Sequence, residues 1–210
     1  MKMPRIPEAT VTRLSLYSRF LENLERMGVE FVSSGEIAEG LSINPAQVRK
    51  DLAYFGDFGT RGVGYRVKDL LSCTLNILGL DQKWPLILVG AGALGYAVCG
   101  YQGFNKRGFS IVAVFDSNPA KIGKMVGSIE VLPMGKMTEI IKNRRVRIGI
   151  IAVPANAAQE AVDQMVENGL EGVLNYTPVN LVTPDAVKVI NIDLSVGLES
   201  LTFKLSQKEL

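Results

Sequence analysis

The 210-residue sequence contains no histidine and only two cysteines. Without histidine, the chain cannot form a Ser-His-Asp triad, an HExxH metal site or the histidine acid/base pair of many hydroxyacid dehydrogenases. Cys73 and Cys99 lie far apart in apolar surroundings and form no CxxC pair, so neither a disulfide framework nor a zinc ribbon is expected. We therefore expect a cytoplasmic protein without a bound metal.

Long apolar runs are also missing. The longest uncharged stretch begins at Trp84 and is interrupted by glycines, which predicts a core strand followed by a turn, and no membrane partner. Hydrophobic residues make up 47% and charged residues 21% of the chain, which is ordinary globular composition. The formal net charge is only +2, so nucleic-acid binding has to be argued from the local distribution of charge.

The first part of the chain carries helix signals. Apolar residues recur three and four apart over residues 9–27, which predicts a helix. Ser33 and Glu36 fit a capping box that opens a short helix ending near residue 41. Asn44 before Pro45 opens another short helix, which runs to about residue 55. Two short helices joined by a turn predict a helix-turn-helix.

The segment after these helices predicts a wing. Residues 57–67 alternate aromatic or branched side chains with glycines, as a two-stranded hairpin does. A connecting helix over residues 69–80 and a linker over residues 81–85 follow. We predict a winged-helix domain over residues 1–82.

The second part of the chain alternates strands with helices. Short β-branched runs are typical of strands buried on both faces of a parallel sheet. This alternation predicts an α/β domain with a Rossmann-like, doubly wound parallel sheet over residues 83–193. The predicted strands cover residues 86–89, 110–115, 129–132, 146–153, 172–174 and 187–192, and the clearest helices cover residues 93–103, 134–143 and 155–168.

A glycine motif follows the first of these strands. In GAGALG, residues 90–95, Gly90 permits a tight turn, Gly92 lets the backbone approach a pyrophosphate, and Gly95 lets helix and strand pack closely. The strand before the motif and the helix after it are the context that a dinucleotide-binding motif needs. A glycine-rich turn that merely connects a strand to a helix is the alternative.

Asp116 closes the second strand, about 20 residues after the glycine motif. A carboxylate there can accept both hydroxyls of an adenosine ribose and repels a 2′-phosphate. No arginine follows among residues 117–119 to offset the repulsion, so the sequence favours NAD(H) over NADP(H).

The helix-turn-helix and wing carry local positive charge. Between Asn44 and Lys68 there are five basic and two acidic residues. Residues on the solvent face of the third helix are placed to reach base edges and phosphates, and basic residues of the wing to reach an adjacent groove. A helical dimerisation domain with a solvated basic face is the alternative. The candidate DNA-contacting residues are Ser42, Asn44, Gln47, Arg49, Lys50, Tyr54, Arg61, Gly62 and Tyr65.

A leucine seam follows the last strand. Leu194, Leu198, Leu201 and Leu205 are spaced four, three and four apart, which predicts a helix with one apolar stripe. The stripe packs either on its own sheet or in a second subunit. Because a protein with one small DNA-binding domain usually binds a two-fold symmetric site as a dimer, we expect a homodimer. No Tyr-x-x-x-Lys pair occurs, so no short-chain dehydrogenase activity is expected.

Three runs together resemble the Rex family of bacterial redox-sensing transcriptional repressors: QVRKDLAYFG at 47–56, GTRGVGY at 59–65 and VGAGALG at 89–95. The resemblance spans essentially the whole chain. It implies a homodimer whose C-terminal helix, residues 194–210, is swapped onto the partner. It also implies a repressor, and not an enzyme, that binds palindromic double-stranded operator DNA and is released when NADH binds, while NAD+ competes weakly or favours the DNA-bound form.

The resemblance also implies particular site residues. Arg19, Tyr101 and Asp193 match positions that link cofactor state to the angle between domains, and we hypothesise that Asp193 exchanges partners between Tyr101 and Arg19. Leu194 departs from relatives that carry an aromatic residue beside the nicotinamide. The candidate NADH/NAD+-binding residues are Gly90, Ala91, Gly92, Ala93, Leu94, Gly95, Tyr101, Asp116, Ser117, Val153, Pro154, Asn175 and Pro178.

Two other classes of protein compete with this interpretation. An NAD-dependent oxidoreductase needs a substrate domain and an acid/base, yet the helix-turn-helix occupies the remaining residues. A module that binds another nucleotide or coenzyme A shares the first strand-turn-helix unit. Asp116 favours a ribose with free hydroxyls over the 3′-phosphate of coenzyme A.

Overall fold

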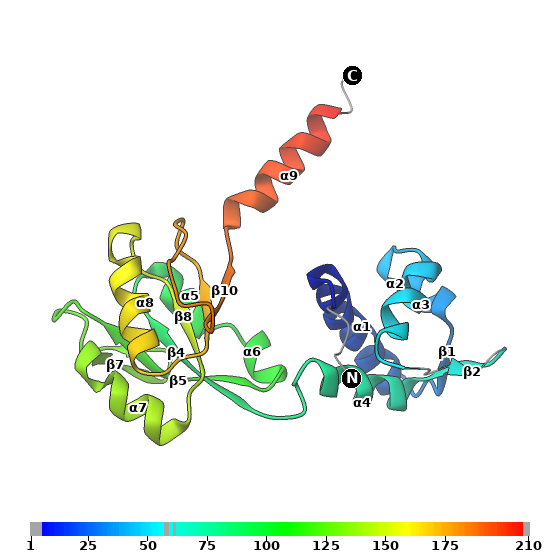
Figure 1. Ribbon diagram of the computed structural model, residues 1–210, viewed down its shortest axis with the longest axis horizontal. Helices are drawn as coiled ribbons and strands as arrows, with labels where there is room; N and C mark the ends of the chain where they lie inside the picture. The colour runs from blue at the N-terminus through cyan, green and yellow to red at the C-terminus, as the bar shows by residue number, and fades with distance from the viewer. Residues whose placement is uncertain (1–5, 57–58, 61, 208–210) are drawn as a thin grey trace. The chain divides into compact units, whose positions relative to one another are not determined.

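The computed structural model describes residues 6–56, 59–60 and 62–207. The chain divides into two compact units, Met1–Gln82 and Lys83–Leu210. The helices and strands of both units are labelled in Figure 1.

The first unit is built on four helices. They are α1 (Glu8–Arg26), α2 (Ser34–Leu41), α3 (Pro45–Ala53) and α4 (Val67–Ile77). The Ser33 hydroxyl accepts from the Glu36 amide while the Glu36 carboxylate accepts from the Ser33 amide, so the predicted capping box is formed. The Asn44 side chain accepts from the Ala46 amide and caps α3.

A small sheet forms the wing. Strands β2 (Gly59–Thr60) and β3 (Gly64–Arg66) are antiparallel, as predicted, and β3 also pairs with β1 (Phe31–Val32). The sequence missed β1 because two residues are too short to show a period. Residues 57–58 and Arg61 of the predicted wing lie outside the described residues.

The second unit holds a seven-stranded sheet over its described residues, in the order β10-β9-β8-β4-β5-β7-β6. All neighbours are parallel except the edge pair of β6 and β7. Strand order runs outward in both directions from β4, so the sheet is doubly wound, as predicted. The strands are β4 (Trp84–Val89), β5 (Phe109–Asp116), β6 (Met125–Val126), β7 (Ile129–Pro133), β8 (Ile148–Ile151), β9 (Gly172–Asn175) and β10 (Lys188–Asn191).

Alternate residues of β4 point into two different cores. Ile87 and Val89 pack with side chains of α7 (Met137–Arg144) and α8 (Ala158–Glu167), which lie on one face of the sheet (Figure 1). Leu86 and Leu88 pack on the other face, with Val98 of α5 (Ala93–Cys99). Short 3-10 turns, Met134–Lys136 and Ala155–Ala157, precede α7 and α8.

Some predicted bounds were wrong. The helix predicted over residues 93–103 is two helices, α5 and α6 (Gly103–Lys106), because Gly100 ends the first. The strand predicted from residue 146 begins at Ile148. Arg145 adopts a left-handed conformation with φ 52°, and the Val146 amide bonds back to the Ile141 carbonyl, so Val146 belongs to the end of α7.

One face of the sheet carries an apolar hollow of about 330 Å³. Residues of β4, β5, β8, β9 and β10 line it, among them Ile148, Ile150, Leu174 and Ile190, together with Phe104 of α6. The connection from β9 to β10, residues 176–187, contains no helix.

The C-terminal helix is α9 (Leu194–Ser206), and all of its residues are described. None of them is buried, and its apolar side chains are 52% to 66% exposed. Over the described residues, no helix is long and apolar enough to cross a membrane.

Candidate functional site

The glycine motif forms the tight turn between β4 and α5. Gly90 has φ 108°, and a Cβ there would lie 2.3 Å from the Ala152 carbonyl oxygen. A Cβ on Gly95 would lie 1.9 Å from the Gly90 carbonyl oxygen. Both positions therefore require glycine, one for conformation and close approach and the other for helix-strand packing.

Gly92 differs from these two glycines. A Cβ built on it would meet nothing within 4 Å, so this side of the turn faces open space. Among the described residues, no side chain caps α5, so the N–H groups of its first turn are offered to a ligand at this end of the helix. An open approach and unpartnered N–H groups fit the pyrophosphate of a dinucleotide.

A cleft of about 430 Å³ opens at the carboxyl ends of β4, β5 and β8. This is the edge of a doubly wound sheet where ligands bind. The cleft brings together residues that the sequence separates widely: Gly90, Gly92, Asp116, Ser117, Val153 and Pro154 all line it. Lys121 also lines the cleft and was not predicted.

Asp116 is only 7% exposed. Its carboxylate accepts from the Ala91 amide at 2.8 Å, the Asn118 amide at 2.9 Å and the Lys121 ammonium at 2.8 Å. Burial raises the pKa of Asp116, but the hydrogen bonds from Lys121, Asn118 and Ala91 outweigh it and lower that pKa.

These contacts bear on the ribose contact expected of Asp116, which stays a prediction. A carboxylate has about four acceptor positions, and three are in use, so Asp116 can accept one ribose hydroxyl in this geometry rather than two. Lys121 offsets the negative charge that was expected to repel a 2′-phosphate. The prediction from sequence considered only residues 117–119, and Lys121 lies two residues beyond them.

The predicted nicotinamide neighbours fall into three places. Val153 and Pro154 line the cleft. Tyr101 is 55% exposed, packs edge-on against Phe104 with ring centroids 5.2 Å apart, and lines a smaller hollow of about 270 Å³. Pro178 is exposed.

Asn175 is fully buried and holds the loop that follows β9. Its amide donates to the Val179 carbonyl and to the Asn191 side chain, and its Oδ1 accepts from the Thr177 amide and hydroxyl. Asn175 therefore shapes this loop from within, and its side chain has no free group for a ligand.

In the first unit, a groove of about 480 Å³ brings the wing next to α3 and the start of α2. Arg49, Gly62 and Tyr65 line it together with Ser34. Arg49 donates to the Ser34 hydroxyl at 3.0 Å. Burial raises the pKa of Tyr65 while the Arg49 charge lowers it, so the two side chains are neighbours. Three of the predicted DNA-contacting residues therefore share one concave surface.

The other predicted DNA-contacting residues differ in exposure. Lys50 is exposed on α3, and Tyr54, at the end of α3, is half-buried. Ser42 takes the left-handed conformation that ends α2, with φ 54°. Gln47 is half-buried and donates to Asp51 at 2.8 Å.

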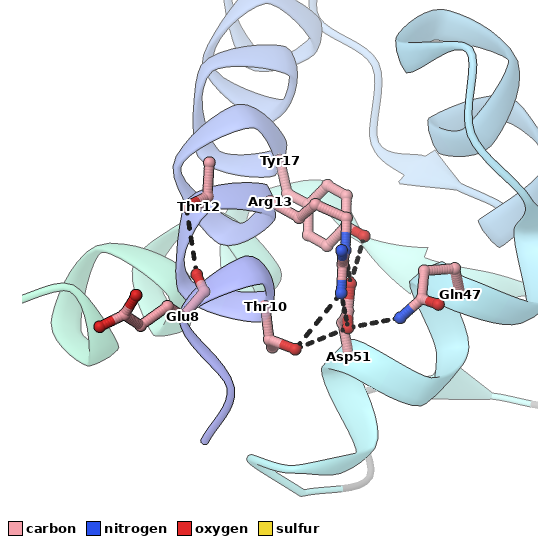
Figure 2. A network of polar contacts seen from close by, with 7 residues as sticks. All are labelled: Glu8, Thr10, Thr12, Arg13, Tyr17, Gln47 and Asp51. Atoms are coloured by element: carbon pink, nitrogen blue, oxygen red, sulfur yellow. Dashed lines mark hydrogen bonds and ion pairs between the residues drawn. The ribbon is translucent and has the colours of Figure 1, made fainter. Parts of the chain in front are cut away.

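Asp51 is the centre of a polar cluster that the sequence did not reveal (Figure 2). It is fully buried on α3 and accepts from Arg13 at 2.5 and 2.8 Å, from Tyr17 at 2.7 Å, and from Thr10 and Gln47. Burial raises its pKa, but these hydrogen bonds lower it to about 2. The hydrogen bond to Asp51 raises the pKa of Arg13. Burial, and after it the hydrogen bond to Asp51, raises the pKa of Tyr17.

The cluster joins α1 to α3 by charge as well as by packing. In the sequence analysis Asp51 entered only as one of the two acidic residues in the local charge balance of the helix-turn-helix and wing. The signal that could have found it is position, because Asp51 lies between Val48 and Leu52 on the buried side of α3.

The predicted switch residues lie in both units. Arg19 is exposed on α1. Asp193 caps α9, since its carboxylate accepts from the Ser195 amide at 2.8 Å and from the Ser195 hydroxyl at 2.7 Å. These hydrogen bonds lower the pKa of Asp193. Among the described residues, no group of three or more His, Cys, Asp or Glu side chains is placed to hold a metal.

A winged helix with Arg49 in the groove beside its wing, followed by a dinucleotide-type fold with an open glycine cleft, defines a ligand-responsive transcriptional regulator. Two family models match the chain: "Putative DNA-binding protein N-terminus" over residues 5–53 and "CoA binding domain" over residues 81–179. The chain belongs to the Rex family of redox-sensing transcriptional repressors.

Curated relatives support this membership along the whole chain. The redox-sensing transcriptional repressor Rex of Pelotomaculum thermopropionicum is 62% identical over 100% of this chain and 98% of its own. That of Desulforamulus reducens is 59% identical over 100% of both chains. The relatives are named as repressors and not as enzymes.

Solved structures agree with these relatives. The Rex-family repressor RSP in complex with β-NAD+ and operator DNA has a TM-score of 0.91 and 35% identity, over 98% of this chain and 95% of that one. RSP in complex with β-NADH has a TM-score of 0.87 and 33% identity, over 98% of this chain and 97% of that one.

Proposed function

We propose that this chain is a transcriptional repressor that binds operator DNA as a homodimer and leaves it when NADH binds. The observation that carries the proposal is the open glycine cleft, with Gly92 facing free space and Asp116 at the neighbouring strand end, in a chain that also has a basic winged helix. In the cytoplasm, where such a regulator meets DNA, it would respond to the ratio of NADH to NAD+.

The cleft residues have separate tasks in this proposal. The N–H groups of the first turn of α5 bind the pyrophosphate, and Asp116 accepts an adenosine ribose hydroxyl while Lys121 balances its charge. Val153 and Pro154 border the nicotinamide, and Tyr101 lies near it. The bound dinucleotide supplies the difference between reduced and oxidised rings that the protein senses.

In the first unit, α3 enters the major groove and the wing contacts the adjacent groove or backbone. Arg49 and Lys50 provide the positive charge that positions the domain on phosphates. Ser42, Asn44, Gln47, Tyr54, Arg61, Gly62 and Tyr65 complete the contact surface in this proposal.

The dimer is proposed to form through α9. Its apolar side chains are exposed along the helix, and the sheet hollow lined by Ile148, Ile150, Leu174 and Ile190 is apolar as well. Two unpartnered apolar surfaces favour swapping of residues 194–210 between the two copies.

A ligand can shift DNA binding only through its different affinities for two arrangements of the dimer. NADH therefore favours an arrangement whose recognition helices do not match two half-sites, and operator DNA weakens NADH binding by the same factor. We propose that Asp193 exchanges partners between Tyr101 and Arg19 in this transition, which requires it to give up part of its bonding to Ser195.

The ligand class is tested by titrating the protein with NADH, NADPH and coenzyme A and following NADH fluorescence. We expect saturable NADH binding, weaker NADPH binding, and no displacement of NADH by coenzyme A. Tighter binding of coenzyme A than of NADH would overturn the assignment of the cleft.

A further inference from the structure

One side chain of α3 is hydrogen-bonded to the Asp51 cluster. Gln47 and Asp51 lie one turn apart on α3, and the Gln47 Nε2 donates to the Asp51 Oδ1 at 2.8 Å (Figure 2). An ionised carboxylate only accepts hydrogen bonds, so the amide nitrogen of Gln47, and not its oxygen, must face Asp51.

The other end of the Gln47 amide is available. Its Oε1 accepts no hydrogen bond from the described residues, and no buried side-chain oxygen or nitrogen among them lacks a partner. The Oε1 of Gln47 is therefore reached by solvent. Nε2 carries two N–H groups, so one remains after the bond to Asp51.

We propose that Asp51 orients Gln47 so that its free amide edge reads an adenine in the major groove. This inference rests on the proposed DNA binding by α3. Glutamine recognises adenine by accepting from N6 and donating to N7, which needs an oxygen and an N–H side by side. Gln47 offers this pattern when the N–H that points away from Oε1 bonds Asp51, and the carboxylate of Asp51 prevents the amide from turning over.

The carboxylate itself is fixed from α1. Arg13 bonds both of its oxygens, and Tyr17 donates to Oδ2, the oxygen that Gln47 does not use. Asp51 is therefore a positioning residue: it touches no DNA, and it acts through Gln47.

The test selects DNA from a randomised double-stranded library with the full-length chain and sequences the bound fraction. We expect the wild type to require an adenine at one position of each half-site. Gln47→Ala should reduce that preference about fivefold or more and leave the other positions unchanged. Asp51→Asn should reduce it at the same position, because an amide at residue 51 can donate as well as accept and no longer fixes Gln47.

Tyr17→Phe is the matched control. It removes one hydrogen bond from the same carboxylate at Oδ2 and should retain the adenine preference. If Gln47→Ala keeps the base preference at every position, Gln47 does not recognise the adenine. If Asp51→Asn keeps the adenine preference, Asp51 does not orient Gln47. If the wild type selects no sequence at all, the proposed DNA binding fails with it.

A second measurement needs no change at residue 51, in case Asp51→Asn does not fold. 7-Deazaadenine, which lacks the N7 acceptor, is placed at the selected adenine, and binding is compared with that of ordinary adenine. The wild type should lose about fivefold in affinity and Gln47→Ala should lose none. Equal losses in both proteins, or no loss in either, would contradict the inference.

Discussion

The charge of Asp51 should make a large and pH-dependent contribution to the stability of the first unit. Its hydrogen-bond donors lower the pKa from its ordinary value of 3.8 to about 2. At about 1.4 kcal/mol per pKa unit, this shift corresponds to about 2 kcal/mol at neutral pH. Replacement by Asn keeps the shape, removes the charge and leaves Arg13 unpaired.

The exposure of Arg13 limits how much stability the Asp51→Asn replacement removes. Breaking a buried pair by removing one partner costs about 3 to 5 kcal/mol, but the side chain of Arg13 is 24% exposed, and solvent can hydrate it. We therefore expect Asp51→Asn to lower the free energy of unfolding by about 2 to 3 kcal/mol at pH 6.

The sign of the pH dependence follows from a lowered pKa. The stability that the Asp51 charge provides is fully present above the unfolded pKa near 4, and it is lost as pH falls through the folded pKa near 2. The difference in the free energy of unfolding between the wild type and Asp51→Asn should therefore shrink by about 1 kcal/mol between pH 6 and pH 3.

Thermal unfolding of the full chain, followed by far-UV circular dichroism at pH 6 and pH 3, measures this difference in stability. Hydrogen exchange in peptides of α1 and α3 shows whether the difference lies in these two helices. Asp69→Asn, which changes an exposed carboxylate on α4 of the same unit, is the control and should have little effect. Equal stability of the wild type and Asp51→Asn at pH 6, or a difference that does not shrink toward pH 3, would refute this account of the cluster.

Three further predictions concern the second unit. Gly95→Ala should lower the melting temperature, because its Cβ would lie 1.9 Å from the Gly90 carbonyl oxygen, whereas Gly92→Ala, which meets nothing within 4 Å, should keep the melting temperature and weaken NADH binding in a fluorescence titration. Lys121→Ala should weaken NADPH relative to NADH by about fivefold, since it removes the cation that offsets Asp116; an unchanged ratio would contradict that role. Leu198→Asp, which places a charge on the exposed apolar stripe of α9, should shift the dimer toward monomer in sedimentation velocity, and an unchanged dimer would exclude α9 from the interface.

Local signals allowed much of the fold to be predicted. The capping box at Ser33 and the Asn44 cap are short-range patterns, and the structure forms both. The glycine motif also carries its own context of strand and helix. The doubly wound sheet follows from alternation of strands and helices, which is visible along the chain.

What the sequence did not predict depends on distant residues. Asp51 meets Arg13 and Tyr17 of α1 only after the helices pack. Its place between Val48 and Leu52 indicates a buried position, but nothing within α3 specifies the partners on α1. Lys121 pairs with Asp116 through a turn whose geometry no motif specifies. Asn175 belongs to the predicted nicotinamide loop, but long-range bonds to residues such as Asn191 turn its side chain inward.

Reduced and oxidised dinucleotides are proposed to act differently on the DNA binding of this protein. The most direct test is fluorescence anisotropy of a palindromic DNA, selected by the protein itself, during separate titrations with NADH and NAD+ at a fixed salt concentration. We expect release at far lower NADH than NAD+. Saturable DNA binding that neither nucleotide changes would contradict it.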